Sequence, residues 1–177
     1  MMSGESRAVA RSGELRRAAD RGDAEAVAEL LNEGADPNAR NRFGSTALHL
    51  AARHGHSSVV ELLLAHGALT SRRDNHGNTP AVLATWGVHR DALRVLLEQA
   101  VDLPELEKEI CLAWAIILAD VPSVLLLLQA GADPEIRGHR GWTGKDFARH
   151  WYETGRRGPY EASYREILGL IEPAAAS

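Results

Sequence analysis

The sequence predicts an all-α solenoid of about five helix-turn-helix repeats, joined by short hairpin loops. Small and apolar residues recur every 33 positions, the length of a repeat made of one turn and two antiparallel helices. The recurring alanines let two helices approach closely, and the leucines offer apolar surface that only a neighbouring repeat can cover. The recurring residues are Gly44, Thr46, Ala51, Leu63 and Leu64, which return as Gly77, Thr79, Ala84, Leu96 and Leu97.

The chain begins with an expected tail and a shortened first repeat. Residues 1–12 carry charge and serine without an apolar core, which predicts a disordered tail and no secretory signal. The first repeat, over 13–40, keeps the paired Leu30 and Leu31 but lacks a hairpin. Gly34 follows its second helix, where a left-handed residue ends a helix without a steric cost.

The second repeat, over 41–73, carries the clearest motif. It reads Gly44-Ser45-Thr46-Ala47-Leu48-His49 where its first helix starts, and it ends in Gly67-Ala68. This pattern resembles the ankyrin-repeat family, with alanine in place of the usual proline after the threonine. The resemblance implies a stack of helix pairs and makes the first repeat similar to an N-terminal capping repeat. It also implies that His49 braces the turn near Thr46.

The third and fourth repeats keep part of this pattern. The third, over 74–103, retains Thr79 and Pro80. The fourth, over 104–137, matches the second helix of the repeat through Leu127 and Leu128, but its first helix comes two positions early. Leu103–Glu109 therefore indicates an early helix start, with a proline in the first turn and carboxylates near the positive end of the helix dipole.

The fifth repeat, over 138–171, departs from the pattern of the second repeat, as the fourth does. Gly141, Thr143 and Ala148 hold the register, and Tyr160–Ile171 has apolar residues at helical spacing, which predicts a C-terminal cap. Residues 172–177 are expected to be a tail. We therefore expect a single ankyrin-repeat domain over 13–171.

Composition and charge argue against several function classes. The net charge of −4 and the isoelectric point near 6.1 provide no electrostatic reason to bind nucleic acid. The most apolar stretch, Ile110–Leu118, has about half the length that a membrane span needs. The single cysteine, Cys111, is expected to be buried and inert, which favours a reducing, cytoplasmic setting. We expect a monomer.

Chemical motifs are largely absent from the sequence. No phosphate-binding loop, nucleophile elbow or zinc spacing is present, so we expect no enzyme, no catalytic residue, no cofactor and no metal. His49, His54 and His56 lie close together, but the resemblance gives the first and last of them structural roles. Asp20, Asp146 and His150 are candidates for acid–base chemistry on their spacing, but such chemistry would need a closed pocket. His66 and His89 are expected in solvated loop or cap positions.

The resemblance implies that a partner protein is contacted through the hairpin tips and the inner face of the first helices, a concave strip. Tryptophan and arginine dominate many interfaces, so Trp86 and Trp142 are expected on the surface, whereas Trp114 is expected in the core. The predicted partner-binding residues are Arg42, Phe43, Arg53, His54, His76, Trp86, Ile117, Arg140, Trp142, His150 and Trp151.

Three functions remain open. The first is a non-catalytic protein-binding module. The second is a stoichiometric inhibitor of an enzyme, because Gly34–Asn38 and Asn41–Gly44 are similar to the start of the ankyrin-repeat inhibitors of cyclin-dependent kinases, although the regular first helix of the second repeat departs from that group. The third is a small-molecule-binding or catalytic variant, which would use a notch near the fourth repeat bordered by Trp86, Ile117 and Trp142.

Overall fold

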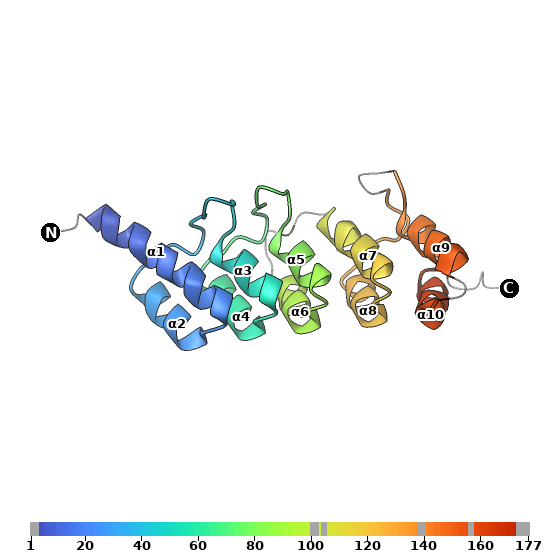
Figure 1. Ribbon diagram of the computed structural model, residues 1–177, viewed down its shortest axis with the longest axis horizontal. Coiled ribbons are helices and arrows are strands. Elements are labelled where there is room, and N and C mark those ends of the chain that lie inside the picture. The colour runs from blue at the N-terminus through green and yellow to red at the C-terminus, as the bar shows by residue number, and fades with distance from the viewer. Residues whose placement is uncertain (1–3, 100–102, 104–105, 138–140, 156–157, 173–177) are drawn as a thin grey trace. The chain divides into compact units, whose positions relative to one another are not determined.

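The computed structural model describes residues 4–99, 103, 106–137, 141–155 and 158–172 of the 177-residue chain. Over these residues the chain forms ten α-helices and no strand (Figure 1). In chain order the helices are α1 (Gly4–Arg21), α2 (Ala24–Asn32), α3 (Ala47–His54), α4 (Ser57–Ala65), α5 (Pro80–Trp86), α6 (Arg90–Gln99), α7 (Glu107–Ile117), α8 (Val121–Gln129), α9 (Gly144–Gly155) and α10 (Glu161–Ile171). The all-α prediction is confirmed.

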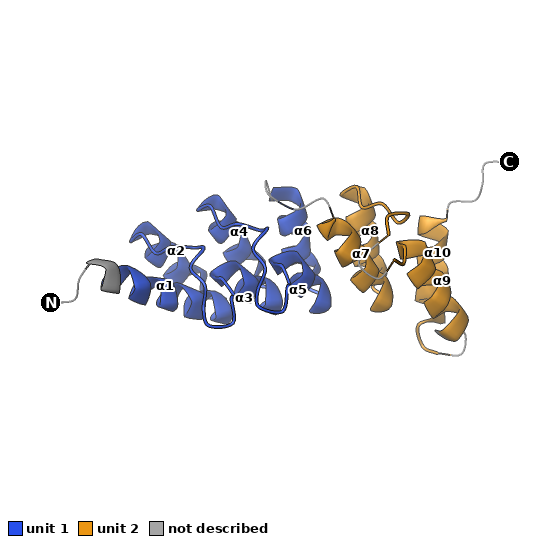
Figure 2. Cartoon of the chain, turned by 90° about the horizontal axis from the view of Figure 1, so that it is seen from above, with its two compact units in different colours: residues 1–103 blue, residues 104–177 orange. Residues whose placement is uncertain are grey.

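The chain divides into two compact units (Figure 2). Unit 1 comprises residues 1–103 and unit 2 comprises residues 104–177. The boundary falls where the fourth repeat was expected to begin. That residues 13–171 form a single domain stays a prediction.

Unit 1 consists of three helix pairs, namely α1 with α2, α3 with α4, and α5 with α6. The first helices contact one another in the order α1, α3, α5, and the second helices do so in the order α2, α4, α6 (Figure 1). The recurring Ala51 and Ala84 are fully buried, as are Leu63 and Leu96. The 33-residue recurrence therefore marks side chains that fill the core of successive repeats, and the predicted helix-pair stacking is confirmed here.

The ends of these helices follow from local sequence. The Thr79 hydroxyl accepts a hydrogen bond from the Val82 N–H at 3.4 Å, and Pro80 occupies the first turn of α5, where no backbone donor is needed. At the end of α4, Gly67 has a φ of 79°. The Gly67 N–H donates to Leu64 O at 3.0 Å and the Ala68 N–H donates to Leu63 O at 2.9 Å, which is the Schellman arrangement.

Unit 2 consists of two helix pairs, α7 with α8 and α9 with α10. Within it α7 contacts α9, and α8 contacts α10. Val124 and Leu127 of α8 are fully buried, as their counterparts Val60 and Leu63 are in unit 1. The repeat pattern thus continues in unit 2 despite its divergent sequence.

Helix α7 starts early, as predicted. It begins at Glu107, eight residues before the buried Ala115, whereas α3 and α5 begin only four residues before Ala51 and Ala84. One more helical turn therefore occupies positions that belong to the hairpin in the other repeats. Pro104 lies outside the described residues.

The last helix packs against α8 and α9 in the way expected of a cap. Tyr164, Ile167 and Ile171 of α10 are buried. The Tyr164 hydroxyl donates a hydrogen bond to Ile117 O at 3.0 Å, which ties α10 to the end of α7. Residues 173–177 of the expected tail lie outside the described residues.

The expectation of a disordered tail over 1–12 is wrong for residues 4–12, which belong to α1. Contacts from a segment far along the chain support this extension. The Ser12 hydroxyl donates to Ala8 O at 3.0 Å and accepts from the Asp36 N–H at 3.1 Å, and Arg11 pairs with Glu33 at 3.2 Å. Glu33 and Asp36 come after α2 in the sequence. The composition of residues 1–12 therefore did not show that these contacts would hold the segment as a helix.

Two composition-based expectations can be compared with the structure. Cys111 is buried in α7, as predicted. Within the described ranges, no helix combines the length and the apolar character needed to cross a bilayer.

Candidate functional site

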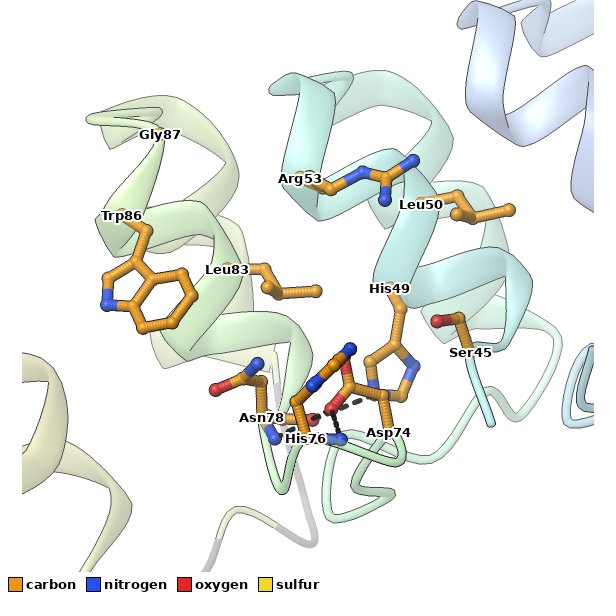
Figure 3. A pocket seen from close by; sticks show the side chains of 10 residues that line it. All are labelled: Ser45, His49, Leu50, Arg53, Asp74, His76, Asn78, Leu83, Trp86 and Gly87. Carbon is orange, nitrogen blue, oxygen red and sulfur yellow. Dashed lines mark hydrogen bonds between the residues drawn. The ribbon is translucent and has the colours of Figure 1, made fainter. Parts of the chain in front are cut away.

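The predicted partner-binding residues of unit 1 are all exposed. They are Arg42, Phe43, Arg53, His54, His76 and Trp86. The structure brings three of them, Arg53, His76 and Trp86, to one hollow of about 540 Å³ (Figure 3). We call it the α3–α5 hollow, and its lining residues are Ser45, His49, Leu50, Arg53, Asp74, His76, Asn78, Leu83, Trp86 and Gly87.

Two helices provide the walls of the α3–α5 hollow. Leu50 and Arg53 lie three positions apart on α3, and Leu83 and Trp86 lie three positions apart on α5, so each pair shares one helix face (Figure 3). The two pairs are also 33 positions apart, so they are equivalent positions in successive repeats. The prediction missed Leu50 and Leu83, although the shared helix face and the 33-residue recurrence together would have indicated both.

The hairpin before α5 closes one end of the α3–α5 hollow. The Asp74 carboxylate accepts hydrogen bonds from the backbone N–H groups of His76 and Asn78, both at 2.9 Å (Figure 3). The Asn75 N–H donates to Phe43 O at 2.9 Å, and the Asn75 side-chain amide donates to Arg42 O at 3.0 Å. These bonds join two successive hairpins, so the backbone that carries His76 is held before any partner binds.

The exposed Arg53 and His54 beside the hollow share one carboxylate. Asp20 Oδ1 lies 3.3 Å from Arg53 Nη2 and 3.2 Å from His54 Nε2. A solvent-exposed pair of this kind contributes little to stability, but it orients the two side chains. On the neighbouring hairpin, the guanidinium carbon of Arg42 lies 4.6 Å from the centroid of the Phe43 ring, a cation–π contact.

His49 lies at the base of the α3–α5 hollow and is fully buried. Its Nδ1 accepts from the Thr46 N–H at 3.2 Å and lies 2.9 Å from Thr46 Oγ1, and its Nε2 lies 3.2 Å from Asn78 O. The structural role that the resemblance implied is thus present. Burial lowers the pKa of His49, because a charged imidazole is poorly solvated there.

We expect His49 to make the protein less stable in acid. Its folded pKa is lowered, so below the unfolded pKa of about 6.5 the unfolded state binds more protons, and stability falls as pH decreases from there. The slope from one proton is at most about 1.4 kcal/mol per pH unit. Urea unfolding of the wild type and of His49→Gln between neutral and mildly acidic pH checks this. The variant should be less stable at neutral pH and show a shallower pH dependence.

His76→Gln is the matched control, because His76 is an exposed histidine of the same unit. It should keep the wild-type pH dependence. Equal slopes for the wild type and His49→Gln would show that His49 is not the source of the acid sensitivity.

The predicted residues of unit 2 gather around α9. Trp142, His150 and Trp151 are exposed, Ile117 is half-buried, and Arg140 lies outside the described residues. The His150 ring is 5.1 Å from Trp142 and 5.5 Å from Trp151, between ring centroids. Offset or edge-on aromatic contacts at these distances are favourable, so the three rings form one continuous aromatic surface.

Ile117 and Trp151 also line a hollow of about 350 Å³ together with Tyr160 and Tyr164. The predicted surface positions of Trp86 and Trp142 are confirmed, whereas Trp114 is half-buried and not a core residue. The notch expected between Trp86, Ile117 and Trp142 draws on both units and stays a prediction.

The candidates for acid–base chemistry have structural partners. The Thr143 N–H donates to Asp146 Oδ2 at 2.9 Å and the Asp146 N–H donates to Thr143 Oγ1 at 3.1 Å, a reciprocal cap at the start of α9. The hydrogen bond that the Thr143 N–H donates to the carboxylate lowers the pKa of Asp146 by stabilising its charged form, and the Thr143 side chain lowers it further. Across the described ranges, no group of three or more His, Cys, Asp or Glu side chains could hold a metal ion.

Comparison with known proteins adds one finding. A family model of ankyrin repeats in three copies matches residues 15–107, which is more than half of the chain. The matched span begins within α1, contains α2 to α6 and ends at the first residue of α7. No curated protein matches the sequence.

Proposed function

Because the chain belongs to the ankyrin-repeat family, whose repeats are generally non-catalytic protein-interaction modules, we propose that it binds a partner protein through the α3–α5 hollow. The observation that carries this proposal is the pairing of Arg53 with Trp86. They are equivalent residues of successive repeats, both are exposed, and both line the same hollow. Arginine and tryptophan are the residue types most enriched among those that dominate binding energy.

The chemistry of the hollow suits an inserted side chain. Leu50, which is half-buried, and Leu83, which is buried, provide an apolar wall. Arg53 and His76 place polar groups at the rim. An apolar side chain of the partner would be buried against the leucines and Trp86. Carbonyl or carboxylate groups of the partner beside that side chain would accept hydrogen bonds from Arg53 and His76 at the rim. The bonds that join the two hairpins reduce the ordering cost of binding.

The titratable groups of the hollow support binding over catalysis. Asp74 already accepts from two backbone N–H groups, and His49 is held between Thr46 and Asn78. Neither is poised to exchange a proton with a ligand. The similarity to kinase inhibitors is not favoured either, since α3 is a regular helix of eight residues and that group has a shortened helix there.

We also propose that the protein acts as a monomer in a reducing, cytoplasmic setting. The cysteine content supports the second part: the sequence has one cysteine, the buried Cys111, whereas a protein that matures in an oxidising compartment more often carries several cysteines in disulfides.

The test is partner capture with single alanine variants. Tagged wild-type protein and Trp86→Ala are used to capture partners, the partner specific to the wild type is identified by mass spectrometry, and its affinity is measured by calorimetry. We expect Trp86→Ala to bind at least about thirty-fold more weakly, which corresponds to a hot-spot loss of about 2 kcal/mol.

Leu69→Ala is the matched control. Leu69 is another large apolar side chain of unit 1, 37% exposed against 43% for Trp86, and it does not line the hollow. It should retain wild-type affinity. If Trp86→Ala keeps both its fold and its full affinity, the α3–α5 hollow is not the binding surface; a loss confined to Trp142→Ala would move the surface to α9.

A further inference from the structure

A buried carboxylate in unit 2 has an oxygen with no partner. Glu109, in the first turn of α7, is only 9% exposed. Its Oε1 accepts a long hydrogen bond, 3.3 Å, from the Asp133 N–H, whereas Oε2 is buried without any hydrogen-bond partner among the described residues. Burying a charged group without satisfying its hydrogen bonds is costly, so the position of Glu109 calls for a ligand that supplies a donor.

Glu109 lines a hollow of about 480 Å³ at the start of α7, which we call the α7 hollow. Its other lining residues are Leu106, Lys108, Gly131 and Ile136. Leu106 and Ile136 are large apolar side chains that are nonetheless 43% and 42% exposed. The α7 hollow thus combines one buried acid with two exposed aliphatic side chains.

The neighbouring cation does not satisfy this acid. Lys108 Nζ donates to Ala130 O at 2.7 Å, at the C-terminal cap of α8, where the helix dipole favours a positive charge. In the part of the chain that the structure describes, Glu109 takes part in no ion pair. The terminal χ3 angle of a glutamate has a broad distribution, so a small rotation of the carboxylate presents Oε2 to the α7 hollow. The long hydrogen bond to Oε1 holds the carboxylate only weakly against this rotation.

We propose that the α7 hollow binds an arginine side chain of a partner polypeptide. The guanidinium group donates to the Glu109 carboxylate, and the methylene groups of the side chain lie against Leu106 and Ile136. A guanidinium is more weakly hydrated than an ammonium and offers several donors in one plane, which suits a shielded carboxylate. Among the described residues that line the hollow, Glu109 is the one acidic side chain, and no group of three or more metal-binding side chains is found in the described ranges, so a guanidinium suits the hollow better than a metal ion.

The test is an NMR titration of the full-length protein. The probe is Nα-acetyl-arginine methylamide, and the matched neutral probe is Nα-acetyl-citrulline methylamide, which has nearly the same shape. We expect saturable shifts of the amide signals of Leu106, Lys108, Glu109 and Ile136 with the arginine probe. Binding of the citrulline probe should be about tenfold weaker or worse, because a hydrogen bond to a charged group is stronger than a neutral one.

Glu109→Gln should weaken the arginine probe by about the same factor, since it removes the charge and keeps the shape. Glu166→Gln, an exposed acid of α10 outside the α7 hollow, should leave binding unchanged. The melting temperature of Glu109→Gln should be equal to or above that of the wild type, because an unpaired buried charge is removed.

Ile136→Ala provides a second variant that does not touch the acid, and it should weaken the arginine probe a few-fold because apolar contact is lost. The proposal is overturned by unsaturable shifts, by equal binding of the two probes, or by undiminished binding to Glu109→Gln. A clear drop in the melting temperature of Glu109→Gln would also overturn it, since the carboxylate would then serve the fold.

Discussion

Leu63→Ala is expected to lower the free energy of unfolding by about 2 to 5 kcal/mol. Leu63 is fully buried on α4, and α4 contacts α3 in its own repeat as well as α2 and α6 in the adjacent repeats. Removing the side chain leaves a cavity in a core that three repeats share. In a stack of repeats, stability depends on such interfaces between neighbours, so the loss affects the whole of unit 1. Urea unfolding followed by far-UV circular dichroism measures it.

Leu64→Ala is the matched control on the same helix. Leu64 is only half-buried, so less apolar surface is lost and the destabilisation should be clearly smaller. A Leu63→Ala protein as stable as the wild type, or equal losses at the two positions, would contradict the packing of α4 described above.

Gly55→Ala is expected to cost about 2 to 3 kcal/mol, from two separate sources. Gly55 has a φ of 74°, which an alanine adopts only with strain. An added Cβ would also lie 2.5 Å from Nδ1 of His89. That ring is held by a contact of 3.0 Å between its Nε2 and Arg53 O, so moving it breaks a bond between successive repeats.

Gly67→Ala separates the two sources. Gly67 has nearly the same φ, 79°, but nothing lies within 4 Å of an added Cβ. It should therefore show the backbone cost alone, about 1 kcal/mol. In the double variant Gly55→Ala/His89→Ala the steric conflict is gone. The double variant should therefore lose less stability than the sum of the losses of the two single variants. Equal destabilisation by Gly55→Ala and Gly67→Ala, measured by urea unfolding, would show that contact with the His89 ring does not add to the cost at Gly55.

His89 illustrates how far the sequence could be followed. Its position 33 residues after His56 was visible, but a solvated loop or cap position was expected for it. The structure shows that both rings reach back to the preceding repeat, His56 Nε2 to Asp20 O at 3.3 Å and His89 Nε2 to Arg53 O at 3.0 Å. The recurrence indicated an equivalent role for the two histidines, and only the packed repeats showed what that role is.

The candidate surfaces were predictable to different degrees. The exposure of Trp86 and Trp142 followed from the register of the repeat and is confirmed. The apolar wall formed by Leu50 and Leu83 was missed, although the two leucines are 33 positions apart and share a helix face with Arg53 and Trp86. Glu109 was expected only as a carboxylate near a helix start, since the sequence does not show that Asp133 and Ile136 come to lie beside it.

The sequence alone determined the helix pairs, their 33-residue register and the early start of α7. All of these depend on residues within about one turn or one repeat, where steric and hydrogen-bonding preferences act locally. The tertiary structure decided the helical state of residues 4–12, the α3–α5 hollow and the burial of Glu109. These features depend on contacts between segments 20 or more residues apart, such as Ser12 with Asp36 and Glu109 with Asp133, which arise only once successive repeats have packed.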